Sequence, residues 1–217
     1  MEALATPLYR IYNILFAAYG PQHWWPGDTP FEIMAGAILT QATAWSNAEQ
    51  AIANLKQANV LAPCMIRNLP QEELAKLIRP AGYHNVKAER LKALVAWLSA
   101  ANNTETAFGK NTATLRAELL AAPGIGPETA DSILLYAAAK PVFVIDAYTR
   151  RILRRLGLAS GKESYEMLQQ HFMEDLPAEA VLYNEYHALL VRLGKEACLT
   201  TPRCRRCCLD KFCPKKI

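Results

Sequence analysis

The sequence predicts an all-α protein, and three observations support this prediction. Apolar residues recur at helical spacing between 88 and 98, and near the N-terminus at Leu8, Ile11, Tyr12, Leu15, Phe16 and Tyr19. Glycine and proline residues separate such segments, at 20–21, 26–30, 80–82 and 123–127. The one strand-like stretch, Val142 to Ile145, has no second strand to pair with, so we expect an extended connection there.

Other segments show the same periodicity and complete the helical prediction. They cover residues 31–40, 46–57, 71–79, 111–121, 128–139, 147–156, 164–174 and 178–193. No internal repeat or low-complexity segment interrupts them.

Length and composition indicate a globular protein. The chain has 217 residues, of which 52% are hydrophobic and 20% charged, enough to bury one large core or two small ones. No stretch approaches the roughly 18 apolar residues that a membrane span needs, and the N-terminus lacks the pattern of a signal peptide. We therefore expect a cytoplasmic protein without membrane contact.

The formal charge of +4 is compatible with a polyanionic partner but does not identify one. Its distribution is more informative. Six Lys or Arg residues stand against one Asp between 198 and 217, and four arginines crowd one segment: Arg150, Arg151, Arg154 and Arg155. Each basic patch fits either a solvated helix face or a surface for phosphate groups.

Four cysteines near the C-terminus have the spacing C-x5-C-x2-C-x5-C: Cys198, Cys204, Cys207 and Cys213. In a cytosolic chain they are poor candidates for disulfides, and four thiolates from one short loop suit a zinc ion or an iron-sulfur cluster. The compact run with long gaps favours the cluster. Cys208 is an alternative to Cys207, but the register of the other three favours Cys207, and we leave Cys64 and Cys208 as non-ligands.

Residues 120–130 read LAAPGIGPETA, which predicts the end of one helix, a tight turn and a new helix from about Pro127. The backbone N–H groups of Gly124, Ile125 and Gly126 would then lie at a helix N-terminus. Free donors and the helix dipole favour a phosphate there without reading base identity. A turn of this kind is more often a plain connection, so the segment alone does not establish DNA contact.

Asp146 follows Glu128 by eighteen residues and precedes the arginine-rich segment. An aspartate at this point caps a helix by default. The hairpin, the aspartate and the cysteines nevertheless occur in one order and spacing, and together they resemble the endonuclease III family of helix-hairpin-helix DNA glycosylases. Further segments match this family in order: LTQATA (39–44), AGYHNVKAERL (81–91), LAAPGIGPETAD (120–131) and YHALLVRLGKEAC (186–198).

The resemblance covers nearly the whole chain and implies a two-lobed helix-hairpin-helix DNA glycosylase fold. A six-helix domain would cover 22–130 and end in the hairpin. Residues 1–21 and 131–217 would form a second helical domain, in which the loop 198–213 binds a [4Fe-4S] cluster through the four cysteines. The implied activity is base excision repair, as a monomer acting on double-stranded DNA with a damaged base.

One departure from the family concerns the chemistry. Members that also cleave the DNA strand carry a lysine at the hairpin position that is Glu128 here. A carboxylate cannot form a Schiff base with the sugar, so the sequence predicts a monofunctional glycosylase with weak or absent lyase activity. Lys110 and Lys140 do not occupy the matching position.

The resemblance also implies roles for other residues. Asp146 would stabilise the oxocarbenium-like sugar and orient or deprotonate a water molecule, with Glu128 as a second carboxylate. Gln41 and Tyr83 match the positions that enter the DNA stack when the damaged base is flipped out.

The segment HWWP and a tryptophan at position 45 are similar to the endonuclease III-like 3-methyladenine glycosylases. Trp24, Trp25 and Trp45 would form the base pocket, because aromatic rings attract a positively charged alkylated purine. Tryptophans at helix ends also serve core packing, which is the simpler interpretation.

Two alternatives to this function remain open at this point. One is an endonuclease III-type glycosylase and abasic-site lyase acting on oxidised pyrimidines, which needs another amine in place of the missing lysine. The other, from a different class, is a non-catalytic DNA-binding or redox-sensing module.

Overall fold

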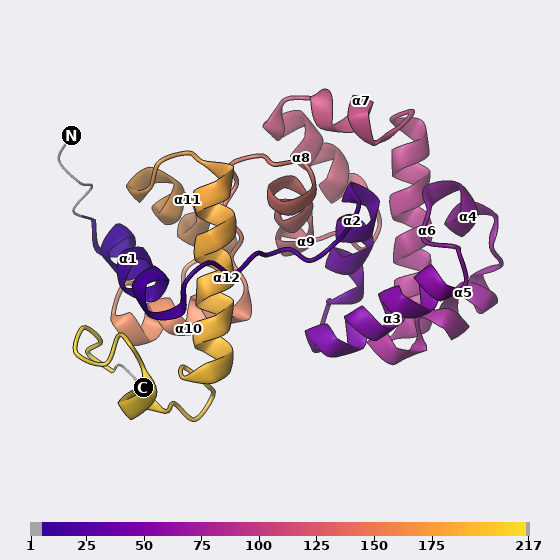
Figure 1. The fold of residues 1–217 in the computed structure, drawn as a ribbon. Helices are drawn as coiled ribbons and strands as arrows, with labels where there is room; N and C mark the ends of the chain where they lie inside the picture. Colours follow the sequence, from indigo (N-terminus) through magenta and orange to yellow (C-terminus); the bar gives the residue numbers. More distant parts are fainter. Residues whose placement is uncertain (1–5, 216–217) are drawn as a thin grey trace. The chain divides into compact units, whose positions relative to one another are not determined.

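The structure, a computed structural model, describes residues 6–215 of the chain (Figure 1). This range contains twelve α-helices, two short 3-10 turns and one π-helical segment, and it contains no strand, so the all-α prediction is confirmed. The α-helices are α1 Pro7–Tyr19, α2 Pro30–Leu39, α3 Trp45–Gln57, α4 Pro63–Asn68, α5 Gln71–Leu77, α6 His84–Ala100, α7 Thr104–Gly109, α8 Thr112–Ala121, α9 Pro127–Ser132, α10 Ala147–Leu156, α11 Tyr165–Asp175 and α12 Ala180–Glu196.

The chain divides into two compact units. The first unit consists of the segment up to Trp25 together with the segment from Pro141 onward, and the second unit is Pro26–Lys140. The sequence-based boundaries lay after residues 21 and 130. The second unit contains eight α-helices, four of them with seven residues or fewer, where six helices were expected.

Two helices of the second unit were not expected from the sequence. Helix α4 begins with Pro63, and α7 begins after Asn103, whose side chain accepts a 2.7 Å hydrogen bond from the amide of Thr106. Each has only six residues, too few to show a helical period. The segment 128–139 was expected to be one helix, but α9 ends at Ser132 and a π-helical segment follows over Ile133–Ala137.

Helix α2 is the central helix of the second unit. The side chain of Thr29 caps it by accepting the amide of Glu32 at 3.2 Å, and Pro30 fits the first turn. Eight of its ten residues are buried, and α3, α6 and α9 pack against it. Glu32 is among the buried residues and is paired with Lys56 at 2.7 Å.

The hairpin predicted at 120–130 is present in the second unit. Helix α8 ends at Ala121 and α9 begins at Pro127, as expected. Arg116 from α8 donates two hydrogen bonds, of 2.6 and 3.0 Å, to the fully buried carboxylate of Asp131 in α9. This two-point contact fixes the angle between the two helices of the hairpin.

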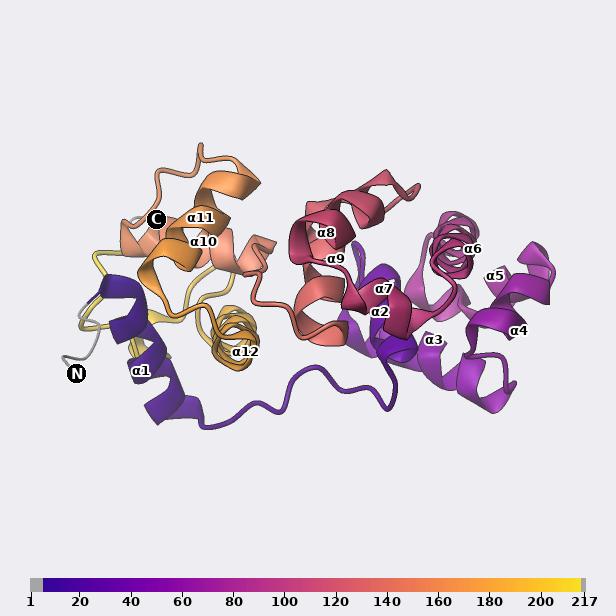
Figure 2. The same ribbon diagram turned by 90° about the horizontal axis from the view of Figure 1, so that it is seen from above.

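In the first unit, α1 and α10 pack against α12, which Figure 2 shows nearly end-on. The Tyr186 hydroxyl of α12 donates a 2.8 Å hydrogen bond to the carbonyl of Leu8 in α1. Phe143 stacks on Phe172 with ring centroids 3.8 Å apart. The predicted extended connection at 142–145 is present without strand pairing, and its burial explains why its sequence is apolar.

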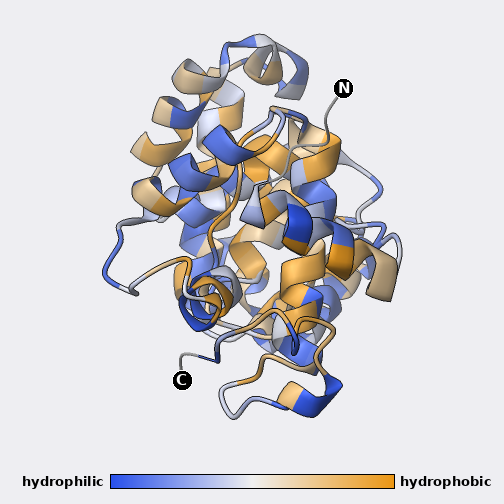
Figure 3. Cartoon of the chain, turned by 90° about the vertical axis from the view of Figure 1, so that its left-hand side faces the viewer, coloured by the Kyte–Doolittle hydropathy of each residue, from blue (hydrophilic) through white to orange (hydrophobic). Residues whose placement is uncertain are grey.

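Hydrophobic and hydrophilic residues alternate along the helices (Figure 3), and apolar side chains fill the core of each unit. Within residues 6–215, no helix is both long and apolar enough to cross a bilayer.

Candidate functional site

Asp146 is the N-cap of α10 in the first unit. Its Oδ1 accepts a 2.7 Å hydrogen bond from the amide of Thr149, and its backbone is extended, as capping requires. The second oxygen, Oδ2, lies 3.7 Å from Nε2 of His187 on α12. The helix end thus fixes the carboxylate through one oxygen and leaves the other for a second role.

His187 is a buried titratable group next to this carboxylate. Burial lowers the pKa of His187, and the charge of Asp146 opposes that shift. The neutral ring is therefore favoured at neutral pH. Phe143 meets the ring of His187 edge-on at a centroid distance of 6.4 Å, which adds to its apolar surroundings.

The three residues of the hairpin turn differ in what they can offer a ligand. Gly124 is exposed and has a positive φ of 83°, and a Cβ there would lie 2.3 Å from Cγ of Arg90, so the fold itself requires glycine. Ile125 is buried, and its amide donates to the carbonyl of Ala122 at 3.1 Å. At Gly126 a Cβ would meet nothing within 4 Å and φ is −92°, so packing within the described protein does not require glycine there.

Gln41 follows α2 and is hydrogen-bonded to the hairpin. Its Nε2 donates to the carbonyl of Gly124 at 3.1 Å and to Oγ1 of Thr129 at 2.9 Å. Arg90, from α6, donates from Nη1 to Oε1 of Gln41. To enter a DNA stack, as predicted from the sequence, this side chain must exchange these bonds for DNA contacts.

Tyr83 precedes α6 and is 73% exposed. Its backbone is left-handed, with φ 45° and ψ 34°, which is uncommon for an aromatic residue. The turn therefore presents a large ring to solvent on a sharply bent backbone, and the DNA contact of this ring stays a prediction.

Glu128 is exposed in the first turn of α9, directly after the hairpin turn. The two lysines considered as substitutes for the missing amine are both engaged within the second unit. Lys110 pairs with both oxygens of Glu118 at 2.7 Å, and Nζ of Lys140 donates to the carbonyl of Lys110 at 3.0 Å.

The three tryptophans predicted to form a base pocket are distributed over the two units. Trp24 and Trp25 belong to the first unit, with ring centroids 4.9 Å apart and planes inclined by 56°. Trp45 begins α3 in the second unit and lines a pocket of about 260 Å³. The charged residues that line this pocket are Asp28, Glu32, Glu49 and Lys56.

The four predicted ligand cysteines surround one small pocket of the first unit, and Cys208 does not line it. The lining includes Cys198, Cys204, Cys207 and Cys213. In a tetrahedral zinc site the sulfurs lie only about 3.8 Å apart, because each Zn–S bond is about 2.3 Å long. Within residues 6–215, no three Cys, His, Asp or Glu residues are arranged to hold a metal ion, although the four thiols line the same pocket.

Two arginines of α10 hold the cysteine segment. Arg155 donates to Sγ of Cys198 at 3.3 Å and to the carbonyl of Leu199 at 2.5 Å, and Arg151 donates to the carbonyl of Cys198 at 2.9 Å. Of the four clustered arginines only Arg154 is exposed. The four arginines therefore do not form a simple solvated face. Only part of the cluster is available for phosphate, because Arg151 and Arg155 bind the cysteine segment.

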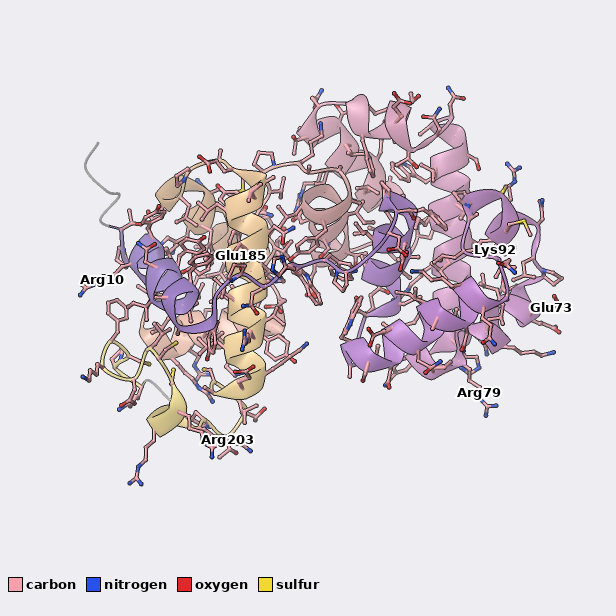
Figure 4. The ribbon with its side chains drawn as sticks, in the orientation of Figure 1. Arg10, Glu73, Arg79, Lys92, Glu185 and Arg203 are labelled. Carbon is pink, nitrogen blue, oxygen red and sulfur yellow. The ribbon has the colours of Figure 1, made fainter. Side chains whose placement is uncertain are left out.

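The second basic patch is exposed on the C-terminal segment, where Figure 4 labels Arg203. Lys215 in this patch pairs with Asp210 at 2.9 Å. Lys216, which the sequence assigned to the patch, lies outside the described residues. The remaining basic side chains of the patch are exposed: Arg203, Arg205, Arg206 and Lys211.

Sequence reasoning gave no role to Lys87, Arg90 or His187. The sequence did contain a signal for Lys87, because this residue shares the helical register of Leu91, Leu94 and Leu98. In the structure Lys87 is buried with them and is 1% exposed. A lysine in an apolar stripe indicates either a buried partner or an error in register.

Comparison with known proteins identifies the family and agrees with the all-helical fold. A model of the HhH-GPD superfamily of base excision DNA repair proteins matches residues 35–178. The chain is 45% identical over 212 residues to MJ1434 of Methanocaldococcus jannaschii, whose name places it provisionally among DNA repair glycosylases, with 96% of each chain covered. It is 29% identical over 188 residues to endonuclease III of Thermotoga maritima, covering 85% of this chain and 82% of the relative.

The fold is also similar to the crystal structure of the H. pylori 3-methyladenine DNA glycosylase MagIII bound to 1,N6-ethenoadenine. The TM-score is 0.77 at 30% identity, and the match covers 88% of this chain and 98% of MagIII. The family match, the hairpin and the all-helical fold lead to one conclusion. The chain belongs to the HhH-GPD superfamily of base excision DNA repair proteins and is a DNA glycosylase of that family.

Proposed function

We propose that this glycosylase hydrolyses the N-glycosidic bond of a positively charged alkylated purine, such as 3-methyladenine, in double-stranded DNA, and that it does not cleave the strand. The observation that carries the proposal is Glu128, an exposed carboxylate in the first turn of α9. The resemblance to the endonuclease III family implies a lysine at this position in members that cleave the strand. An amine is required for the Schiff base that leads to strand cleavage, and a carboxylate cannot replace it.

The alternative amines support this assignment. Lys110 is held by both oxygens of Glu118, and Lys140 donates to a backbone carbonyl. Both Nζ atoms are thus engaged by acceptors of the second unit. Neither amine is therefore prepared for attack on a sugar.

Asp146 is suited to the hydrolytic step. The oxocarbenium-like sugar carries positive charge, which a fixed carboxylate stabilises through space while it orients a water molecule. Because Oδ1 is bound to the amide of Thr149, the carboxylate does not need to be ordered during the reaction. Oδ2 would face the sugar or the water molecule.

The lining of the Trp45 pocket favours a cationic base. Three carboxylates and one ammonium group accompany the indole ring, so the local charge is negative. An aromatic face and nearby carboxylates both attract a cation.

The hairpin would bind the DNA backbone through Gly126. Since the described fold does not require glycine there, close approach of a phosphate to the amide is a reason for its presence. Gly124 is required by the fold, and the Ile125 amide is already used, so these two residues would shape the turn more than they would bind the phosphate.

The pocket lined by the four cysteines would hold the [4Fe-4S] cluster. When bound, such a cluster ties a short segment to the protein by four thiolate bonds and can exchange one electron. The chain's own contribution is the pair Arg151 and Arg155, which hold the backbone and one sulfur of this segment in place.

The test uses the purified protein with two duplex DNA substrates, one methylated and one containing oxidised pyrimidines. Released bases are separated by chromatography, strand breaks are read from a gel, and borohydride is added in parallel to trap any Schiff base. Release of 3-methyladenine without breaks or trapping is the expected result. Breaks at oxidised pyrimidines without release of methylated purines would instead establish the bifunctional alternative.

A pair of variants sharpens the test. Glu128→Lys restores the amine of the strand-cleaving relatives and should produce borohydride-trapped complex, whereas Glu128→Gln should not. Trapping with the wild-type protein at the level of Glu128→Lys would contradict the monofunctional assignment.

A further inference from the structure

Lys87 on α6 is a buried ammonium group with two backbone partners. Its side chain is 1% exposed, and Nζ donates hydrogen bonds of 2.8 Å to the carbonyl of Leu39 and 2.7 Å to the carbonyl of Ala81. Burial of a lysine is costly unless its donors are satisfied, so its retention calls for a reason in the fold or in the function.

The two partner carbonyls belong to the segments that carry the predicted DNA-stack residues. Leu39 precedes Gln41 by two residues, and Ala81 precedes Tyr83 by two residues. The backbone is left-handed in both turns, at Ala42 with φ 51° and at Tyr83 with φ 45°. One ammonium group thus joins two sharp turns that are some forty residues apart in the sequence.

A role for Lys87 as the missing Schiff-base amine does not fit this geometry. Burial, with a smaller effect of the nearby Arg90 charge, lowers the pKa of Lys87 to about 8, which would suit a nucleophilic amine. However, Nζ is enclosed in the core of the second unit and bound to two carbonyls. It cannot reach a sugar without unfolding of this region.

We propose that Lys87 is a positioning residue that holds the Gln41 and Tyr83 turns at a fixed separation, so that both side chains can enter the DNA stack together. This inference rests on the proposed function, because it concerns how that function displaces a base. Groups that are ordered before binding avoid the entropy cost of ordering them on DNA. Lys87 fixes the backbone beneath Gln41, whereas the Gln41 side chain, which accepts from Arg90 and donates to the carbonyl of Gly124, must exchange its bonds on DNA.

Lys92 offers a control on the same helix with the same kind of hydrogen bonds, although it is half-buried where Lys87 is fully buried. Its Nζ also donates to two backbone carbonyls, those of Arg67 at 2.9 Å and of Leu69. Figure 4 labels Lys92 on α6, and its partners belong to α4 and the residue that follows it. Lys92→Met removes the same chemical contact without touching either turn.

The experiment compares the wild type, Lys87→Met and Lys92→Met in two measurements. The first is the single-turnover rate of 3-methyladenine release from methylated duplex DNA at saturating enzyme, with duplex affinity measured separately. The second is amide hydrogen exchange at Gln41 and Gly82, whose amides donate to Ile38 at 3.2 Å and to Arg79 at 3.1 Å. Thermal unfolding shows whether each variant is folded, and Lys87→Leu, which also lacks N–H donors, replaces Lys87→Met if the latter does not fold.

We expect Lys87→Met to release base at least about tenfold more slowly than the wild type, with duplex affinity retained, because misplaced groups slow the reaction more than they weaken binding. The rate of amide hydrogen exchange should increase at both Gln41 and Gly82. Lys92→Met should behave as the wild type in all three respects.

A release rate for Lys87→Met within twofold of that for Lys92→Met, or unchanged exchange at Gln41 and Gly82, overturns the inference. If the wild type releases no alkylated base, the proposed function is wrong, independently of Lys87. Amide hydrogen exchange at Gln41 and Gly82 then tests the positioning role by itself, because it needs no substrate.

Discussion

Oδ2 of Asp146 lies 3.7 Å from Nε2 of His187, while Oδ1 of the same carboxylate accepts the amide of Thr149 at 2.7 Å. The side chains of Asp146 and His187 are only 13% and 7% exposed, so water screens their interaction weakly. Protonation of the ring therefore changes the electrostatic environment of the carboxylate proposed to act on the sugar.

The first prediction follows from this pair and concerns acid stability. The folded pKa of His187 is lowered by burial, so the unfolded chain binds more protons as the pH falls below about 6.5. Stability should thus be complete above that pH and decrease as the pH falls towards the folded pKa. His187→Gln should lose less free energy of unfolding between pH 7.5 and pH 5 than the wild type, measured by urea denaturation. An equal or larger loss in the variant would show that this histidine does not contribute to the decrease.

Asp146→Asn should separate the capping role from the catalytic role. Asparagine caps helices about as well as aspartate, so the free energy of unfolding should change little, whereas Asp146→Ala should cost about 0.5–2 kcal/mol. Both variants should release alkylated base at least about 100-fold more slowly, because they lack the carboxylate charge. Single-turnover release and urea denaturation measure the two effects. Base release by Asp146→Asn at the wild-type rate would remove Asp146 from the mechanism.

The two glycines of the hairpin turn should respond differently to alanine. Gly124→Ala places a methyl group 2.3 Å from Cγ of Arg90 at a positive φ, so we expect a loss of stability of about 1–3 kcal/mol. Gly126→Ala meets no atom within 4 Å, so stability should stay within about 0.5 kcal/mol while duplex affinity falls. Thermal unfolding and fluorescence anisotropy with duplex DNA provide the two readouts. Unchanged duplex affinity in Gly126→Ala would exclude close phosphate approach at this residue.

Cys207 and Cys208 are adjacent in sequence but should differ in their effect on iron. Cys207 lines the pocket formed with the other three predicted ligands, and Cys208 does not. Cys207→Ser should purify with strongly reduced iron and sulfide, because one cluster ligand is replaced, whereas Cys208→Ser should retain both at the wild-type level. Chemical determination of iron and sulfide per chain decides between them, and the opposite pattern would exchange the two assignments.

Local sequence features were sufficient for most of the secondary structure. Periodic apolar residues marked the longer helices, and the Pro-Gly-Ile-Gly turn marked the boundary between α8 and α9, because these signals act over a few residues. The capping role of Asp146 is also local, since its partner is three residues away. Helices α4 and α7 were missed because six residues are too short for a period to show.

The roles of the charged side chains were decided by the tertiary structure. The four arginines of α10 form one cluster in the sequence, yet Arg151 and Arg155 bind carbonyls more than forty residues away. Lys87 likewise finds one of its two acceptors 48 residues away, at Leu39. The sequence by itself determined the longer helices, the hairpin and the residues whose side chains are able to take part in the chemistry. Which of those residues are used to hold the fold, and which remain for DNA, depends on partners that only folding brings within hydrogen-bond distance.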